Sequence, residues 1–261
     1  MQQPINEAPS PRSEDCIIGR NAVSEALRSG RALDSLWIAK GERGGSIGQI
    51  RALCRERGIP VKETDARKLT AVGGANHQGV IAFAACKEYA SLEDVYRRAE
   101  ESGEPLFVLV CDELEDAHNL GAILRSAEAA GCHGVIIPKR RAVGLTSTVY
   151  KTSAGAVEYM PVVRVSNLTE TLKTLKKRGV WVYGLDMDGD DWCRADLSGP
   201  VALVIGSEGH GMSRLVKEQC DGIVSLPMRG KINSLNASVA CGIVVYEVVR
   251  RLLGLKCRKI G

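Results

Sequence analysis

The sequence S-L-P-M-R-G-K-I-N-S-L-N-A-S-V-A-C-G-I-V-V-Y-E (residues 225–247) joins the end of a short apolar strand to a long apolar helix. Asn233, Ser234 and Asn236 carry the kind of side chain that caps free N–H groups at a helix start. From Leu235 onward the helix is apolar on nearly every side, whereas a surface helix has a single apolar stripe. We therefore expect this helix to be buried on two sides, by its own domain and by a further element such as a second subunit.

The sequence before this stretch alternates apolar strands with helices. Residues 106–111, L-F-V-L-V-C, form a continuous apolar run, which is typical of a strand buried on both faces of a parallel sheet. The same reading predicts strands at 135–138, 159–165, 180–185, 201–205 and 223–226, and helices at 120–130, 147–155, 168–178 and 212–217. This alternation predicts an α/β fold with a doubly wound parallel sheet.

A smaller α/β block precedes it, at residues 16–86. Helices are predicted at 19–27, 47–57 and 65–69, and strands at 33–39, from Pro60, and at 77–85. The cations of this block are Arg20, Arg28, Arg31, Lys40, Arg43, Arg51, Arg55, Arg57, Lys62, Arg67 and Lys68. Two interpretations of these charges stay open: a solvated surface, or a face that contacts phosphates and positions RNA without reading its sequence.

The remaining segments are short. Residues 1–15 hold three prolines and few apolar side chains, which predicts a disordered tail. Residues 87–105 are charged and are predicted to be a linker, in which Ser91 and Asp94 form the capping box of a short helix. The larger domain is then expected at 106–255 and a C-terminal tail at 256–261.

Composition and charge exclude several classes of protein. Charged residues make up 25% and apolar residues 44% of the 261 positions, and the net charge of +4 permits a nucleic-acid partner without requiring one. The nine cysteines include no C-x-x-C pair, which favours reduced thiols over a disulfide framework or a zinc site. With no secretory signal and no apolar run of membrane-spanning length, we expect a cytoplasmic protein without a metal.

Three stretches of the larger domain share one design, in which an apolar strand end meets glycine or polar residues and then a helix. They are residues 112–131, 203–212 and 225–247. Ligands of open α/β sheets bind at such carboxyl ends of strands. In the first stretch Arg125 lies among apolar neighbours, and it either serves a site or extends to solvent or pairs with Glu128.

The second stretch, L-V-I-G-S-E-G-H-G-M, is rich in glycine, which allows close approach of a backbone to a ligand. It matches neither the dinucleotide-binding G-x-G-x-x-G pattern nor a P-loop. Glu208 would repel phosphate groups, so the stretch suits a ligand with hydroxyl groups or a positive centre. The alternative is a structural turn, in which His210 is a loop residue and not a catalytic base.

Together and in this order, three motifs resemble those of the SpoU (TrmH-like) 2'-O-ribose RNA methyltransferases, within the SPOUT superfamily. They are N-L-G-A-I-L-R-S-A (119–127), I-G-S-E-G-H-G-M (205–212) and L-P-M-R-G-K-I-N-S-L-N-A-S-V-A (226–240). The first block, with G-R-N-A-V-S-E-A-L and H-Q-G-V, resembles the ribosomal-protein-L30e-like substrate-binding domain of the ribosomal members. The resemblance thus covers nearly the whole chain beyond the N-terminal tail.

The resemblance implies a fold, a cofactor and a set of site residues. The cofactor is S-adenosyl-L-methionine, held in a pocket made by a deep trefoil knot near the C-terminus. Cofactor contacts are implied for Gly206, Leu226, Leu235, Ile205, Gly211 and Met228. Active-site positions are implied for Asn119, Arg125, Glu208, Ser234 and Asn236. The family is typically dimeric through its C-terminal helix, in agreement with the apolar helix above.

For Arg125, the family proposal is that it helps to deprotonate the ribose hydroxyl. Arginine has a solution pKa of about 12.5–13.8 and is almost never neutral. Stabilising the developing alkoxide, or holding the adjacent phosphate, is physically easier, and we expect such a role. The resemblance leaves open whether Arg125 acts in its own subunit's site or across the dimer.

The implied reaction is methylation of a ribose 2'-hydroxyl in RNA, with a guanosine of the large-subunit (23S) ribosomal RNA as the expected target. Within the class, a tRNA 2'-O-methyltransferase is the alternative. A non-catalytic RNA-binding or ribosome-assembly protein of the same fold is a further one, and the intact Arg125, Glu208, Ser234 and Asn236 argue against it. A dinucleotide-dependent enzyme lacks its glycine fingerprint after the first strand.

Overall fold

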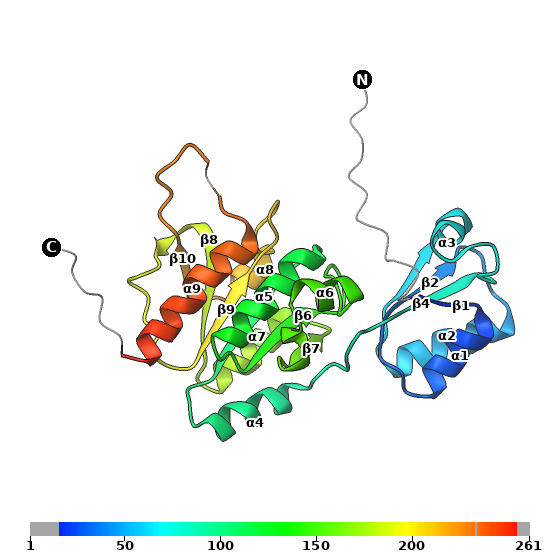
Figure 1. Cartoon of the computed structure of the whole chain (residues 1–261), viewed down its shortest axis with the longest axis horizontal. Helices are drawn as coiled ribbons and strands as arrows, with labels where there is room; N and C mark the ends of the chain where they lie inside the picture. Colours follow the sequence, from blue (N-terminus) through cyan, green and yellow to red (C-terminus); the bar gives the residue numbers. More distant parts are fainter. Residues whose placement is uncertain (1–15, 233, 255–261) are drawn as a thin grey trace. The chain divides into compact units, whose positions relative to one another are not determined.

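The structure is a computed structural model, and it describes residues 16–232 and 234–254. The described part of the chain forms two compact units, which are coloured blue to cyan and green to red in Figure 1. The first contains the described residues up to Glu88 together with Gly144–Ser147. The second contains Tyr89–Val143 and the described residues from Thr148 onward.

The first unit is a mixed four-stranded sheet with the strand order β1-β4-β2-β3. Its elements are β1 (Cys16–Ile18), α1 (Arg20–Arg28), β2 (Leu33–Ala39), α2 (Gly45–Glu56), β3 (Val61–Thr64), α3 (Ala66–Gly73) and β4 (Val80–Ala84). Strand β2 is parallel to β3, whereas β4 is antiparallel to both β1 and β2. The sequence prediction of a small α/β block is confirmed.

The apolar periodicity of α1 and α2 explains how this unit is held together. Val23 and Leu27 of α1 and Ile47, Ile50 and Cys54 of α2 form one buried cluster with alternate residues of β2 and β4. Helix α3 continues to Gly73, beyond the predicted end at Leu69. Asp65 occupies its N-cap position without making a side-chain cap hydrogen bond.

The second unit is built on a six-stranded sheet with the strand order β10-β8-β9-β5-β6-β7, in which every neighbouring pair is parallel. The strands are β5 (Phe107–Cys111), β6 (Gly134–Pro138), β7 (Val162–Val165), β8 (Trp181–Asp191), β9 (Val201–Ile205) and β10 (Gly222–Ser225). The helices are α4 (Leu92–Ser102), α5 (Ala117–Ala129), α6 (Ser147–Thr152), the 3-10 turn η2 (Ala156–Glu158), α7 (Leu168–Lys177), α8 (Arg214–Lys217) and α9 (Ala237–Leu252). The predicted parallel α/β sheet is confirmed.

Helices cover both faces of this sheet, which explains why its central strands are apolar throughout. All residues of β5 and β9 are buried. Val108 and Val110 of β5 face a cluster that includes residues of α4, α7 and α8. Helices α5 and α9 pack against each other, and Figure 1 shows them side by side, with α9 also contacting β9.

Residues 87–105, which the sequence assigns to a linker, contain α4. The predicted capping box is present, because Ser91 Oγ accepts from the N–H of Asp94 and the carboxylate of Asp94 accepts from the N–H of Ser91. Val95 and Tyr96 of this helix are buried in the core of the second unit. Most of the segment predicted as a linker therefore belongs to the second unit.

Strand β8 is longer than the sequence predicts. Its first part pairs with β9 as far as Leu185, where the prediction ends. After a register shift it continues along β10, with Asp190 and Asp191 opposite Val224 and Ser225. Asp190 and Asp191 show no apolar pattern that would predict a strand. Their backbone pairing with β10, a strand distant in sequence, places them in the sheet.

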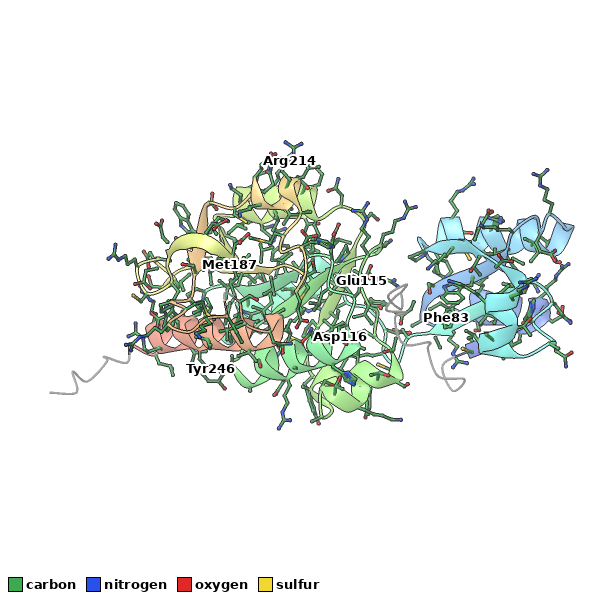
Figure 2. All side chains as sticks on the ribbon, turned by 90° about the horizontal axis from the view of Figure 1, so that it is seen from above. Phe83, Glu115, Asp116, Met187, Arg214 and Tyr246 are labelled. Carbon is green, nitrogen blue, oxygen red and sulfur yellow. The ribbon has the colours of Figure 1, made fainter. Side chains whose placement is uncertain are left out.

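Helix α9 begins at the predicted cap Asn236, whose Oδ1 accepts hydrogen bonds from the N–H groups of Ser238 and Val239 at 3.0 and 3.2 Å. Its buried apolar residues are Ala237, Cys241, Val244, Val245 and Val248. On another side Val239, Ile243 and Tyr246 are 50%, 38% and 52% exposed, and Figure 2 shows Tyr246 on the side of α9 that faces away from the rest of the second unit. Burial by the chain itself is confirmed for one side, and burial of the second side stays a prediction. Asn233, also predicted at this helix start, lies outside the described residues.

The described cysteines are free thiols. Cys54, Cys111, Cys132 and Cys241 are buried, as their apolar neighbours predict. Burial raises the pKa of Cys111 to about 12, so this thiol is protonated and unreactive at neutral pH.

No helix in the described part of the chain is long and apolar enough to cross a membrane. The trefoil knot implied by the resemblance stays a prediction.

Candidate functional site

A cleft of about 890 Å³ opens at the carboxyl ends of β9 and β10 and at the middle of β8, where its pairing with β9 ends. Its walls are these parts of the strands, the loop 206–211, the loop that follows β10, and the first turn of α9. In Figure 1 the loop after β10 is the orange segment that leads into α9. The cleft therefore lies where open parallel sheets bind their ligands.

The glycine-rich loop forms a tight turn at one wall of the cleft. Ser207 and Gly211 exchange two backbone hydrogen bonds, at 3.0 and 2.9 Å. A Cβ atom on Gly206 would lie 2.1 Å from the carbonyl carbon of Gly211, and Gly211 has a φ of +65°. Asp112 Oδ2 accepts a hydrogen bond of 2.7 Å from the N–H of Ser213 and so ties the end of the turn to β5. Both glycines are required for this backbone path.

Three predicted active-site residues meet beside this turn, from three separate stretches of sequence. Asn119, which is 4% exposed, donates from Nδ2 to Glu208 Oε1 at 2.9 Å. Asn236 donates from Nδ2 to Asn119 Oδ1 at 2.9 Å, and also to Oε1 of Glu208. The two amides therefore fix the carboxylate of Glu208 at the edge of the cleft. We call these three residues the polar triad.

The other two predicted active-site residues lie differently. Ser234 lines the cleft, on the loop that precedes α9. Arg125 lies on α5, the same helix as Asn119, and is exposed. It forms no hydrogen bond or ion pair with another described residue, so the alternative of a pair with Glu128 is not realised. Arg125 is not among the residues that line the cleft.

All six residues predicted to contact a cofactor line the cleft. They are Ile205, Gly206, Gly211, Leu226, Met228 and Leu235. Met228 and Leu235 are 38% and 40% exposed, which is unusual for large apolar side chains and gives the cleft an apolar wall. Such a wall suits the face of a flat aromatic ring.

The sequence analysis missed one wall of the cleft, the part of β8 that follows the predicted strand end at Leu185. Leu185, Asp186, Met187 and Asp188 line it. Lys217 Nζ lies 2.7 Å from Asp186 Oδ2. Burial raises the pKa of the Asp186 carboxyl, but the hydrogen bonds from Lys217 and the N–H of Met187 outweigh it and lower the pKa below its ordinary value. Asp186 is therefore ionised at neutral pH. The rule that ligands bind at strand ends applies to β8 as well and could have indicated this wall.

The charge of the cleft indicates what it can hold. Among the described residues, its lining includes the carboxylates of Asp186, Asp188 and Glu208 and no lysine or arginine. This wall repels phosphate groups and attracts a cation. S-adenosylmethionine has a flat adenine, ribose hydroxyls and a positively charged sulfur, so the residues present fit it. A dinucleotide, with its pyrophosphate, does not fit this charge.

Comparison with known proteins gives an independent view of both units. Residues 106–246 match the model of the SpoU rRNA Methylase family, and residues 16–90 match the model described as RNA 2'-O ribose methyltransferase substrate binding. Among curated proteins, "Putative TrmH family tRNA/rRNA methyltransferase YacO" of Bacillus subtilis is 52% identical over 241 residues. The match covers 92% of this chain and 97% of that protein.

Solved structures agree with this match. The SpoU methyltransferase AviRb from Streptomyces viridochromogenes, in complex with the cofactor AdoMet, is 26% identical with a TM-score of 0.59, covering 92% of this chain and 90% of its own. An AdoMet-bound rRNA methyltransferase from Sinorhizobium meliloti is 25% identical with a TM-score of 0.56, covering 93% and 88%. The TrmH/SpoU tRNA-modifying enzyme of A. aeolicus, 25% identical with a TM-score of 0.53, covers only 62% of this chain and 84% of its own.

Proposed function

The chain belongs to the SpoU rRNA methylase family of RNA methyltransferases, and we propose that it methylates a ribose 2'-hydroxyl of ribosomal RNA, on a guanosine of the large-subunit (23S) RNA. The observation that carries the proposal is the polar triad at the edge of a cleft whose shape and charge suit S-adenosylmethionine. Relatives of this family bind that cofactor in their solved structures.

In this proposal the cofactor lies in the cleft. Leu226, Leu235 and Met228 form the apolar wall for its adenine, and the turn from Gly206 to Gly211 lets the backbone approach it closely. When bound, the cofactor supplies a methyl group on a positively charged sulfur. The protein residues therefore have to bring a ribose oxygen into line with that group and hold it there, which lowers the barrier by several kcal/mol in well-oriented reactions.

The polar triad is suited to this positioning. Its carboxylate, Glu208, is held by the amides of Asn119 and Asn236, so it does not reorganise when a substrate arrives. We assign to Glu208 the orientation of the ribose by accepting a hydrogen bond from a hydroxyl group. Ser234, also at the cleft, is assigned to a second polar contact with the substrate.

Arg125 is assigned to the phosphate next to the reacting ribose. It is exposed and has no partner among the described residues, so its guanidinium is available to an incoming anion. A guanidinium binds phosphate through two parallel hydrogen bonds and stabilises negative charge that develops nearby.

The first unit supports ribosomal RNA over tRNA as the substrate. The S. meliloti rRNA methyltransferase matches 93% of the chain, whereas the A. aeolicus tRNA-modifying enzyme matches 62%, which is less than the two units together. Four cations of the first unit are exposed and form no ion pair with a described residue: Lys40, Arg43, Arg67 and Lys68. Strands β2 and β3 are parallel, so their carboxyl ends lie at the same end of the sheet. Lys40 follows β2 and the start of α3 follows β3, so both lie at that end. We propose that this surface, the β2–β3 edge, contacts RNA phosphates.

We also propose a homodimer that forms through α9, and a cytoplasmic location. The exposed stripe of Val239, Ile243 and Tyr246 supports the dimer, because these residues are spaced to share one side of a helix.

The free thiols of the described cysteines support the proposed location, because they fit a reducing compartment such as the cytoplasm.

Mapping of 2'-O-methyl groups in RNA from cells with and without the gene tests this function. We expect a single methylated guanosine in 23S rRNA to disappear when the gene is deleted and to return when it is restored. Loss of a methyl group from tRNA alone would contradict the rRNA assignment and favour the tRNA alternative. Failure of the purified protein to bind S-adenosylmethionine in calorimetry would contradict the methyl-transfer reaction itself.

A further inference from the structure

The middle of β8 places two carboxylates on the cleft wall. Asp186 and Asp188 both line the cleft, as does Glu208 of the glycine-rich turn. They lie where β8 shifts its register against β10, and their neighbours Leu185 and Met187 line the cleft as well. We define the two carboxylates, Asp186 and Asp188, as the acidic wall.

An acidic wall is a costly feature for a protein that binds RNA. Carboxylates that line a site repel the phosphates of an incoming strand, and the described part of the chain places no lysine or arginine in the cleft lining to offset them. The charge therefore serves a ligand other than RNA. The bound cofactor is the one reactant with a positive charge at its reactive centre.

Methyl transfer changes that charge. The carbon–sulfur bond breaks, the carbon–oxygen bond forms, the electron pair stays on sulfur, and the hydroxyl proton leaves to solvent. The product S-adenosylhomocysteine therefore differs from the cofactor by one methyl group and one positive charge. A cleft of about 890 Å³ keeps a bound charge within roughly one Debye length, about 8 Å at physiological salt, of its walls.

We infer that the acidic wall of Asp186 and Asp188 makes the cleft prefer the cofactor, with its positive sulfur, over the product, whose sulfur is neutral, and so promotes exchange of product for cofactor after each turnover. This inference rests on the proposed function. Asp186 and Asp188 are positioning residues that act through space on the sulfur charge, and no direct contact is required of them.

Lys217 sets the strength of the acidic wall. Its Nζ lies 2.7 Å from Asp186 Oδ2, and its side chain is outside the cleft lining. This partner neutralises part of the charge of Asp186 and also interacts electrostatically with Asp188, which is exposed and forms no ion pair with a described residue. Asp188 is therefore the less neutralised of the two carboxylates, and removal of the Lys217 charge should strengthen the effect of both.

The test is calorimetric titration of the full chain with S-adenosylmethionine and, separately, with S-adenosylhomocysteine, which gives the ratio of the two dissociation constants. We expect Asp188→Asn to reduce the preference for the charged cofactor by about two- to fivefold, the range for a solvent-exposed charge. Lys217→Gln should increase that preference. Glu101→Gln, which removes an exposed carboxylate of α4 outside the cleft lining, should leave it unchanged.

The outcomes separate this inference from the function on which it rests. Equal ratios in the native protein, Asp188→Asn and Lys217→Gln would overturn the role of the acidic wall. An equal change in Glu101→Gln would also overturn it, since net charge alone would then explain the effect. Absence of cofactor binding by the native protein would instead remove the proposed function. Because both affinities are measured on the same folded variant, a general loss of stability cancels in the ratio.

Discussion

Asn236 donates a hydrogen bond of 2.9 Å to Asn119, although 117 positions separate the two residues in the sequence. One opens α9 and the other lies in the first turns of α5, and both amides hold Glu208. The contact therefore couples the packing of the two helices to the geometry of the candidate active site. This coupling makes distinct predictions for stability and for activity.

Asn236 serves both as a helix cap and as a member of the polar triad, and two substitutions separate these roles. Asn236→Ala removes the cap and should lower the free energy of unfolding by about 1 kcal/mol. Asn236→Asp keeps a good capping group but places a second carboxylate beside Glu208. We expect Asn236→Asp to retain most of the stability, measured by urea unfolding, and to lose at least about tenfold in methyl-transfer rate. Full activity of Asn236→Asp would contradict the role of the polar triad.

The turn at Gly206 tests the cofactor cleft. A Cβ atom there would lie 2.1 Å from the backbone of Gly211, so Gly206→Ala must displace the turn. We expect a stability loss of about 1–3 kcal/mol and a large drop in affinity for S-adenosylmethionine, both measured on the purified protein. Gly209→Ala is the matched control in the same loop, because no atom lies within 4 Å of its Cβ position. Equal affinities of the two variants would argue against the turn as a cofactor contact.

Arg125 should matter for turnover and not for stability, since it is exposed and has no partner among the described residues. Arg125→Lys keeps the charge but loses the paired donors that match a phosphate. We expect its kcat to fall by about tenfold or more, with an unchanged melting temperature. Arg214→Lys, an exposed arginine on α8 that is labelled in Figure 2, is the control. Retention of most of the turnover by Arg125→Lys would refute a need for bidentate geometry.

The apolar stripe of α9 should hold the dimer together. Tyr246→Glu places a charge on this stripe, so we expect a shift from dimer to monomer in sedimentation velocity while the circular dichroism spectrum stays the same. Tyr159→Glu, at a tyrosine that is 71% exposed elsewhere in the second unit, should leave the dimer intact. A monomeric native protein, or a dimeric Tyr246→Glu variant, would disprove this interface.

The β2–β3 edge of the first unit should contribute to RNA affinity through charge. Combining Lys40→Gln with Lys68→Gln should lower the affinity for rRNA and reduce the slope of log affinity against log salt by about two, or one per lost phosphate contact. Arg28→Gln with Arg51→Gln removes the same charge from residues that already form ion pairs with Glu25 and Glu63. If this control lost as much slope, Lys40 and Lys68 would not contact RNA specifically, and the cations of the first unit would form only a solvated surface.

Much of this architecture could be predicted from local sequence patterns. Strands β5 and β9 are apolar at every position because both faces are covered, and Asn236 is recognisable as a cap. The end of β8 could not be predicted, because Asp190 and Asp191 are held only by pairing with β10, some 35 residues later in the chain. The sequence predicts the capping box of α4 but assigns the helix to a linker, because charged residues surround its few buried side chains.

The site shows a similar division. Local patterns indicated that 112–131, 203–212 and 225–247 each carry a strand end followed by polar residues, and the resemblance to known motifs implied that they act together. The contacts among Asn119, Glu208 and Asn236 are long-range and depend on the order of the strands in the sheet. Asp186 and Asp188 match no motif, but they directly follow the predicted strand end at Leu185, where the rule that ligands bind at strand ends could have indicated them.

The most direct test of the central claim is methylation by the purified protein in solution. Methyl-labelled S-adenosylmethionine is incubated with 23S rRNA, 16S rRNA and tRNA from cells that lack the gene, and the labelled nucleotide is identified. We predict label on the 2'-oxygen of one guanosine of 23S rRNA, and none with the Asn236→Asp variant. Label on a base nitrogen or carbon, or equal label with Asn236→Asp, would contradict ribose methylation at the polar triad.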